Sequence, residues 1–237
     1  MAAVPSFTLP FMTTASSSLQ PKGSDQPRRR GRPVKTEAGQ AALRERIIQS
    51  TAVVYAETGW HKLSVQAVLQ HAGLSRPTFY RHFANIEEPL RLVISRAHQD
   101  LLDRYCGGIA PDAGLEEKML KAVEIYLDWC EAQGGLLRPF FIELHDPLSP
   151  VSALRPQALA RIAEIYTKTL QARGVEVENQ LLVELMVTGI EFLGYRYHLE
   201  RGSRNITVAM IKDAMLRLMH CTMLSPAGRG SAAGDAH

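Results

Sequence analysis

The sequence predicts an all-α protein, with an N-terminal three-helix helix-turn-helix domain followed by a larger helical domain. Three observations support this fold class. Apolar residues recur at the spacing of helical faces, glycines and prolines punctuate the chain at intervals of helix length, and no alternating strand pattern bounded by hairpin turns is present. We place the helix-turn-helix domain at 36–85 and the larger domain at 86–224.

The two ends of the chain are expected to be disordered, over residues 1–35 and 225–237. Residues 1–27 are rich in Ser, Thr, Pro and Ala without periodicity. The basic segment "PRRRGRPVK" follows, and its clustered arginines are Arg28, Arg29, Arg30 and Arg32. Residues 28–100 hold twelve Lys/Arg against six Asp/Glu, whereas residues 101–237 hold fourteen against seventeen. This asymmetry indicates an anionic partner for the N-terminal part.

The first helix is expected from about Ala41 to Thr58, before the C-terminal glycine Gly59. One face of this helix carries the stripe Ile47, Ile48, Thr51, Val54 and Tyr55.

Two short helices then follow, joined by a tight turn at Gly73. Ser64 is expected to cap the helix "VQAVLQHA", and Ser75 to cap "RPTFYRHF", which has a proline in its first turn. Phe79 and Phe83 lie four residues apart and are expected to face the core. The polar side chains left on or near the other faces are Arg76, Thr78, Tyr80, Arg81 and His82. These side chains can donate hydrogen bonds to phosphates and base edges.

The remaining helices are longer. Asn85 and Glu88 have the spacing of a capping box that opens a helix toward Tyr105. Glycine and proline signals separate further helices at about 115–133, 136–145, 152–173, 178–200 and 205–223.

The segment "LSVQAVLQHAGLSRPTFYRHFANIEEPL", residues 63–90, resembles the DNA-binding signature of the TetR family of repressors. The resemblance in motif covers about residues 42–90, and in helix count and length it extends to about residue 223. By matching position it implies that Arg76, Pro77, Thr78, Tyr80 and His82 face DNA, and that Gln66 can reach a base from the supporting helix. We add Ser64, Ser75 and Arg81 as neighbouring candidates. Two positions depart from the family pattern: Ile86 replaces a phosphate-binding lysine, and Pro89 replaces a helix-forming apolar residue.

In such a protein the arginine arm would lie close to DNA. "RGRP" resembles the core of an AT-hook, in which arginines enter a narrow A·T minor groove. A solvated tail and a targeting signal are the alternatives, because basic clusters are promiscuous.

The resemblance also implies a ligand-binding and dimerising C-terminal domain. Two apolar stripes fit an intersubunit four-helix bundle or, alternatively, the subunit's own core, namely Leu182, Leu185, Met186, Gly189 and Leu193, with Ile211, Met215, Leu218 and Thr222. The residues that could line a ligand pocket, or simply belong to the core, are Tyr126, Trp129, Phe140, Phe141, Glu143, His145, Tyr166, Tyr195 and His198. Glu143 and His145 stand out, because a charged group in an apolar site needs a partner.

Other functional classes find little support. No Gly-rich phosphate loop, GxSxG motif or metal-ligand spacing is present, so we expect no catalysis, no cofactor and no metal. No apolar run approaches the roughly 20 residues that span a bilayer, and no signal-peptide core is present, so we expect a cytoplasmic protein without a membrane partner. The sequence therefore predicts a homodimeric repressor that a small molecule releases from a double-stranded operator. A helical interaction module or an RNA-binding module is the alternative.

Overall fold

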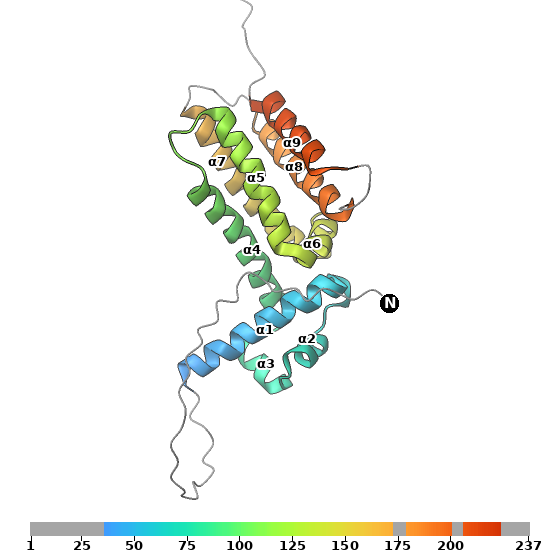
Figure 1. Ribbon diagram of the computed structural model, residues 1–237. Helices are drawn as coiled ribbons and strands as arrows, with labels where there is room; N and C mark the ends of the chain where they lie inside the picture. Colours follow the sequence, from blue (N-terminus) through green and yellow to red (C-terminus); the bar gives the residue numbers. More distant parts are fainter. Residues whose placement is uncertain (1–35, 173–178, 201–205, 224–237) are drawn as a thin grey trace, which may run out of the picture.

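The computed structural model describes residues 36–172, 179–200 and 206–223, and the regular structure within these ranges is helical without a strand (Figure 1). The all-α prediction is confirmed. The arginines of the arm and the glycine turns at 174 and 202 lie outside the described residues. In chain order, with 3-10 turns written as η, the elements are α1 (Glu37–Thr58), η1 (Trp60–Lys62), α2 (Val65–Ala72), α3 (Arg76–His82), α4 (Glu87–Gly108), α5 (Leu115–Gln133), η2 (Gly134–Leu136), α6 (Leu137–Glu143), η3 (Ser152–Leu154), α7 (Arg155–Gln171), α8 (Gln180–Glu200) and α9 (Val208–Met223).

The helix α1 begins at Glu37, earlier than predicted, because the Thr36 side chain accepts a hydrogen bond from the Gly39 N–H at 3.2 Å. This bond satisfies one of the free donors of the first turn. All five members of the predicted stripe on α1 are buried. The helix ends at Gly59, whose φ of 70° lies in the left-handed region that glycine tolerates.

The two short helices α2 and α3 have the predicted bounds to within a residue. The Ser64 side chain caps α2 by accepting from the Ala67 N–H at 3.2 Å, and Gly73 adopts the left-handed conformation between the helices. The prediction that the Ser75 side chain caps α3 is wrong. Its hydroxyl instead lies 3.0 Å from the Thr78 hydroxyl, and its backbone carbonyl accepts from the Thr78 N–H.

The helix α4 is the covalent link between the two parts of the molecule, as Figure 1 shows. At its start the Glu88 N–H donates to the Asn85 side chain at 3.1 Å, and the Glu88 carboxylate accepts from the Ala84 N–H at 3.0 Å. Pro89 lies in the first turn, where a backbone N–H has no partner within the helix. Pro89 therefore removes no hydrogen bond from within α4, although it replaces the helix-forming apolar residue of the family pattern.

The C-terminal helices divide the two predicted apolar stripes between the subunit's own core and its surface. Met186 on α8, and Ile211 and Met215 on α9, are buried within the subunit's own core, as the alternative held. Leu185, by contrast, is 64% exposed. The exposed apolar residues of these two helices are Leu181, Leu182, Leu185, Phe192, Leu199, Val208 and Met210. The uncovered apolar surface thus follows a different helical face from the buried one.

Two further observations bear on the class of protein. Among the described residues, no helix combines the length and apolarity that a bilayer crossing needs. The three cysteines are free thiols, and only Cys130 is buried.

A buried carboxylate joins the two parts of the molecule a second time. Glu143, at the end of α6, accepts hydrogen bonds from the Tyr55 hydroxyl at 3.0 Å and from the Trp60 N–H at 2.6 Å. The Ser149 hydroxyl also donates to it, at 2.9 Å. Desolvation, the largest cause, and the nearby Glu143 charge both raise the pKa of the Tyr55 phenol, so the phenol remains protonated and donates. Glu143 therefore bonds α1 and η1 to the larger domain.

Two ion pairs lie near the same boundary. Arg96 on α4 makes a two-pronged contact with the Glu45 carboxylate on α1, with distances of 2.7 and 2.9 Å. His61 on η1 lies 2.7 Å from Asp146, beyond α6. The hydrogen bond from the Leu148 N–H, followed by that from His61, lowers the pKa of Asp146. Because both ion pairs are solvent-accessible, we attribute most of the attachment to Glu143.

We expect Glu143→Ala to lower the free energy of unfolding by on the order of 3 kcal/mol, because three hydrogen-bond donors lose their acceptor. Glu143→Gln should cost less, since the amide oxygen still accepts and both hydroxyls can rotate to accept from the amide nitrogen. Urea unfolding of the three proteins measures this order, with exposed Glu57→Ala as the control. An unfolding midpoint of Glu143→Ala equal to that of the wild type would contradict this role.

Candidate functional site

The first candidate site is the outer surface of α3. Phe79 and Phe83 point inward and are almost fully buried, which turns the rest of the helix outward. The Tyr80 side chain is 53% exposed, with its ring edge-on to Phe79 at 5.4 Å between centroids. Arg76, Pro77 and Arg81 are exposed as well, and Thr78 and His82 are half-buried. The fold thus gathers the predicted DNA-facing residues of α3 on or beside one accessible surface.

The other predicted residues lie on the supporting helix α2 and at the starts of α2 and α3. Gln66 is exposed in the first turn of α2, and Ser64 and Ser75 stand at the starts of α2 and α3. The Ser64 hydroxyl oxygen already accepts from the α2 backbone, but its own proton remains available as a donor. The backbone N–H groups at the start of a helix also favour an anion. Both helix starts therefore suit phosphate.

The electrostatics of this surface are positive. Neither Arg76 nor Arg81 forms an ion pair with any residue in the described ranges. Arg46 on α1 is exposed, and its guanidinium lies beside the Gly73 turn, at 3.3 Å from the position that a Cβ would take there. The sequence reading did not single out Arg46, because its approach to the turn depends on the packing of α1 over α2. Arg44, in contrast, lies over the Phe83 ring at 5.0 Å and supports the core.

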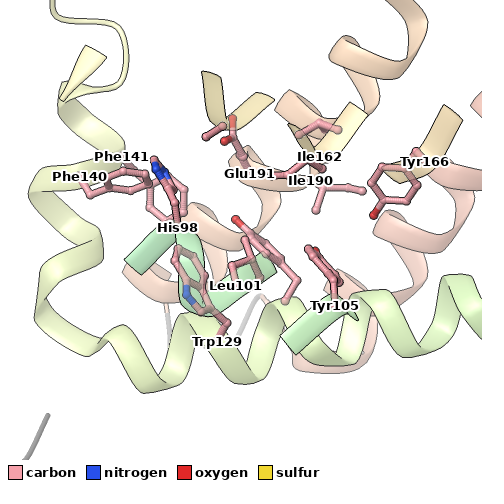
Figure 2. Close-up of a pocket in the computed structure, with 13 residues that line it drawn as sticks. His98, Leu101, Tyr105, Trp129, Phe140, Phe141, Ile162, Tyr166, Ile190 and Glu191 are labelled. Atoms are coloured by element: carbon pink, nitrogen blue, oxygen red, sulfur yellow. The ribbon is translucent and has the colours of Figure 1, made fainter. Parts of the chain in front are cut away.

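The second candidate site is a small cavity in the larger domain, with about 30 Å³ of space for the centres of water-sized molecules (Figure 2). Five of the predicted pocket residues line it, namely Tyr126, Trp129, Phe140, Phe141 and Tyr166. The other lining residues are His98, Leu101, Tyr105, Ala158, Ile162, Val187, Ile190 and Glu191. The walls come from α4, α5, α6, α7 and α8 and are predominantly aromatic and aliphatic, as expected for a small-molecule site.

Four of the predicted pocket residues lie elsewhere. The Glu143 carboxylate accepts its hydrogen bonds at the boundary between the two parts of the molecule, and His145 is exposed. Tyr195 packs behind Phe141, with ring centroids 5.4 Å apart, and His198 is half-buried outside the lining. The partner groups that Glu143 needs are supplied by the protein itself.

Two polar residues of the lining were not predicted. His98 lies four residues after Ile94, next to the buried stripe of α4, so its position could have been inferred from periodicity. Glu191 lies on α8 and lines the cavity, and its ion-pair partner Arg155 is the first residue of α7. That pairing joins distant segments and leaves no local pattern in the sequence.

The ionisable groups of the cavity carry little free charge. Burial lowers the pKa of His98 to about 4, so the imidazole is neutral near pH 7. Burial raises the pKa of Glu191, but the Arg155 guanidinium at 2.9 Å opposes this shift and pairs the carboxylate. The Tyr126 hydroxyl is buried and has no hydrogen-bond partner in the described part of the chain. The cavity therefore offers hydrogen-bonding groups and aromatic faces. No cluster of three metal-ligating side chains occurs within the described residues.

Comparisons with known proteins agree with this arrangement. The family model of the bacterial regulatory proteins of the tetR family matches residues 47–91. A protein described as a TetR-family transcriptional regulator, from Syntrophomonas wolfei, is similar with a TM-score of 0.64 over 81% of this chain and 99% of that chain, at 14% identity. A TetR-like regulator from Rhodococcus sp. RHA1 has a TM-score of 0.57 over 78% and 97%, at 15% identity. A TetR regulator from Chloroflexus aurantiacus has a TM-score of 0.58 over 78% and 96%, at 18% identity. These likenesses show the fold. No curated protein matches the chain.

We expect the stability of the protein to carry a pH dependence from His98. The folded-state pKa of about 4 lies below the unfolded value of about 6.5. Between these values the unfolded chain binds a proton that the native protein does not. The free energy of unfolding must therefore fall as pH falls through this window, by at most about 1.4 kcal/mol per pH unit.

The test is His98→Phe, which keeps a ring against Phe140 but removes the titration. Urea unfolding at a series of pH values should give a shallower slope for this variant than for the wild type between pH 6.5 and pH 4. His71→Phe, at an exposed position, should keep the wild-type slope. Equal slopes for His98→Phe and the wild type would show that His98 is freely protonated in the native state.

Proposed function

Because the chain belongs to the TetR family of bacterial transcriptional regulators, we propose that it is a homodimeric repressor that a small molecule releases from operator DNA. The observation that carries this proposal is the exposed polar and cationic surface of α3, attached to the cavity-bearing domain through both α4 and Glu143. Activity in this proposal consists of binding in the bacterial cytoplasm and includes no catalytic step.

The proposed DNA interface follows from the exposed residues of the helix-turn-helix. The α3 residues enter the major groove, where Arg76 reads a base edge, and Tyr80 and Arg81 contact the groove or the phosphates. Ser64 and Ser75 bind phosphate at the two helix starts, and Arg46 adds a contact from α1. Gln66, Pro77, Thr78 and His82 complete the interface. The arm arginines Arg28, Arg29, Arg30 and Arg32 extend it along the phosphates or into the minor groove.

Dimer formation is the second part of the proposal. The exposed apolar side chains of α8 and α9 form a surface that water disfavours, and a second copy would cover it. A two-fold dimer places one α3 in each of two major grooves, about 34–36 Å apart or a multiple of that. The expected operator is therefore an inverted repeat.

Release by a ligand is the third part. The helix α4 contributes His98, Leu101 and Tyr105 to the cavity and begins directly after the helix-turn-helix. The helix α6 contributes Phe140 and Phe141 to the cavity and ends at Glu143, which holds α1 and η1. A ligand that displaces either helix thus shifts the position of α3. Two connections at separate points would turn a small displacement into a rotation of the DNA-binding domain.

We expect Arg76→Ala to weaken binding to the operator by roughly 1–3 kcal/mol and to relax the preference at one base pair, because the guanidinium can pair with a guanine edge. Footprinting on genomic DNA supplies the operator, and titrations with single-base variants supply the preference. Arg138→Ala, an exposed arginine on α6, is the control. An equal loss of affinity for operator and random DNA would assign Arg76 to phosphate. A footprint without two-fold symmetry would contradict the dimer.

We expect ligand and operator to oppose each other by about 5- to 150-fold, which is the usual range of a 1–3 kcal/mol coupling. Linkage requires that operator DNA weaken ligand binding by the same factor. Calorimetry with a compound found by thermal-shift screening measures both affinities. Glu143→Gln should reduce the factor while the protein still folds, because one of the two connections is weakened. Equal ligand affinity with and without operator would contradict release by the ligand.

A further inference from the structure

Two arginines of α1, Arg44 and Arg46, flank a carboxylate that another helix neutralises. Glu45 stands between them in the sequence, and its carboxylate pairs with Arg96 on α4 at 2.7 and 2.9 Å. Neither Arg44 nor Arg46 donates a side-chain hydrogen bond to a residue in the described ranges, and neither forms an ion pair there. The positive charge of both guanidinium groups is therefore uncompensated by this part of the chain.

The two arginines lie near opposite ends of α3. Residues two positions apart leave a helix in directions about 200° apart. The Arg46 guanidinium lies 3.3 Å from the position that a Cβ on Gly73 would take, and Gly73 is in the turn before α3. The Arg44 guanidinium carbon lies 5.0 Å from the centroid of the Phe83 ring, and Phe83 directly follows α3. One free guanidinium therefore accompanies each end of the helix.

The size of α3 suits this arrangement to a major groove. The helix α1 packs against both α2 and α3, as Figure 1 shows. The seven residues of α3 rise by about 10 Å, and the major groove of B-DNA is about 12 Å wide. Groups beside the two ends of such a helix stand near the edges of the groove, where the phosphates lie.

The contact of Arg44 with Phe83 leaves its hydrogen-bond donors available. A cation above an aromatic ring is held by the quadrupole of the ring and needs no acceptor atom. Arg44 is half-buried, so its aliphatic stem packs against the domain while its charged end can remain in water. A guanidinium has five N–H groups in a planar fork that matches a phosphate. Arg44 can therefore support the core and bind DNA at the same time.

The charge balance of the DNA-binding domain points to the same partner. Residues 36–86 hold five Lys/Arg and three Asp/Glu. Arg96, which lies outside this range, pairs with Glu45. The two remaining carboxylates, Glu37 and Glu57, are exposed at the two ends of α1, away from the middle of the helix that carries Arg44 and Arg46. A polyanion that approaches α3 therefore meets an excess of positive charge.

From this arrangement we propose that Arg44 and Arg46 bind two different DNA phosphates, one beside each end of α3, and so fix the position of this helix in the major groove. These contacts carry no sequence information, because every nucleotide has the same phosphate. The inference rests on the proposed function, since α3 must enter a groove. It deepens that function by assigning a DNA contact to Arg44 and a separate phosphate to each arginine.

The first experiment measures the salt dependence of DNA binding by fluorescence anisotropy, with the full chain. The probes are the operator found by footprinting and a random duplex of the same length. Each neutralised phosphate contributes about 0.9 to the slope of log K against log salt, so the loss of two contacts per dimer should lower the slope by about 1.8. Arg46→Gln and Arg44→Met should each show this decrease on both probes. Methionine keeps a long, flexible side chain against Phe83 and so preserves the packing.

Two sets of control variants complete this experiment. Arg46→Lys and Arg44→Lys keep the charge and should keep the wild-type slope. Arg161→Gln, at an exposed position on α7, should also leave the slope unchanged. A wild-type slope in either Arg46→Gln or Arg44→Met would overturn the proposal, and so would a loss of slope confined to the operator.

Ethylation interference on the operator tests whether the two phosphates differ. In the wild type, ethylation of phosphates at both edges of each half-site should block binding. Arg46→Gln should lose sensitivity at one of these positions, and Arg44→Met at the other. Loss of the same position in both variants would contradict the assignment of one arginine to each end of α3.

The outcomes also separate this inference from the proposed function. Unchanged salt slopes in Arg44→Met and Arg46→Gln, together with a changed base preference in Arg76→Ala, would overturn this inference and support the proposed function. Failure of the wild-type protein to bind either duplex at low salt would overturn both.

Discussion

The burial of the Glu143 carboxylate is the constraint on which the relation between the two parts of the molecule depends. An ionised carboxylate removed from water must be compensated by hydrogen-bond donors, or the fold loses several kcal/mol. The donors here are the Tyr55 hydroxyl, the Trp60 N–H and the Ser149 hydroxyl. Because Tyr55 and Trp60 belong to the DNA-binding domain, satisfying this one carboxylate fixes that domain against α6. Gly59 has a positive φ, and a Cβ there would lie 3.0 Å from the Glu143 carboxylate, so glycine allows the close approach.

The same arrangement connects the DNA-binding surface to the cavity. Phe140 and Phe141 lie on the cavity wall only two or three residues before Glu143, and they share the short helix α6 with it. His98 packs edge-on against Phe140, so α4 and α6 meet at the cavity. In the proposed release, a change of cavity shape would act on both attachments of the DNA-binding domain. Packed helices transmit such a change because interiors are dense and resist compression.

The polarity of the cavity follows from how charge is compensated inside the larger domain. Arg155 donates hydrogen bonds to both Thr188 and Glu191. Glu191 carries the only carboxylate in the lining of the cavity, and because it is paired with Arg155 it is not available to a ligand. Desolvation keeps His98 neutral, and Trp129 donates its indole N–H to the Ala97 carbonyl at 3.0 Å. What remains for a ligand is mostly aromatic and aliphatic surface. The chemistry of the lining thus favours an apolar ligand over a charged one.

The sequence by itself determined the helices and the helix-turn-helix, because these depend on neighbours within a few positions. The spacing of Ile47, Ile48, Thr51, Val54 and Tyr55 predicted the buried face of α1, and Ser64 and Gly73 marked the ends of α2. Periodicity also separated the buried Phe79 from the exposed Tyr80.

Only the tertiary structure decided what buried polar and apolar groups touch. Glu143 had the sequence signature of a pocket residue, yet its donors lie 88 and 83 positions away on α1 and η1. The stripe with Ile211 and Met215 suited either a dimer or a core, and the packing of α9 assigned it to the core. Glu191 reached the cavity through a pairing with Arg155 that spans 36 positions. Helical periodicity records which residues share a face, but it carries no information about which distant face lies opposite.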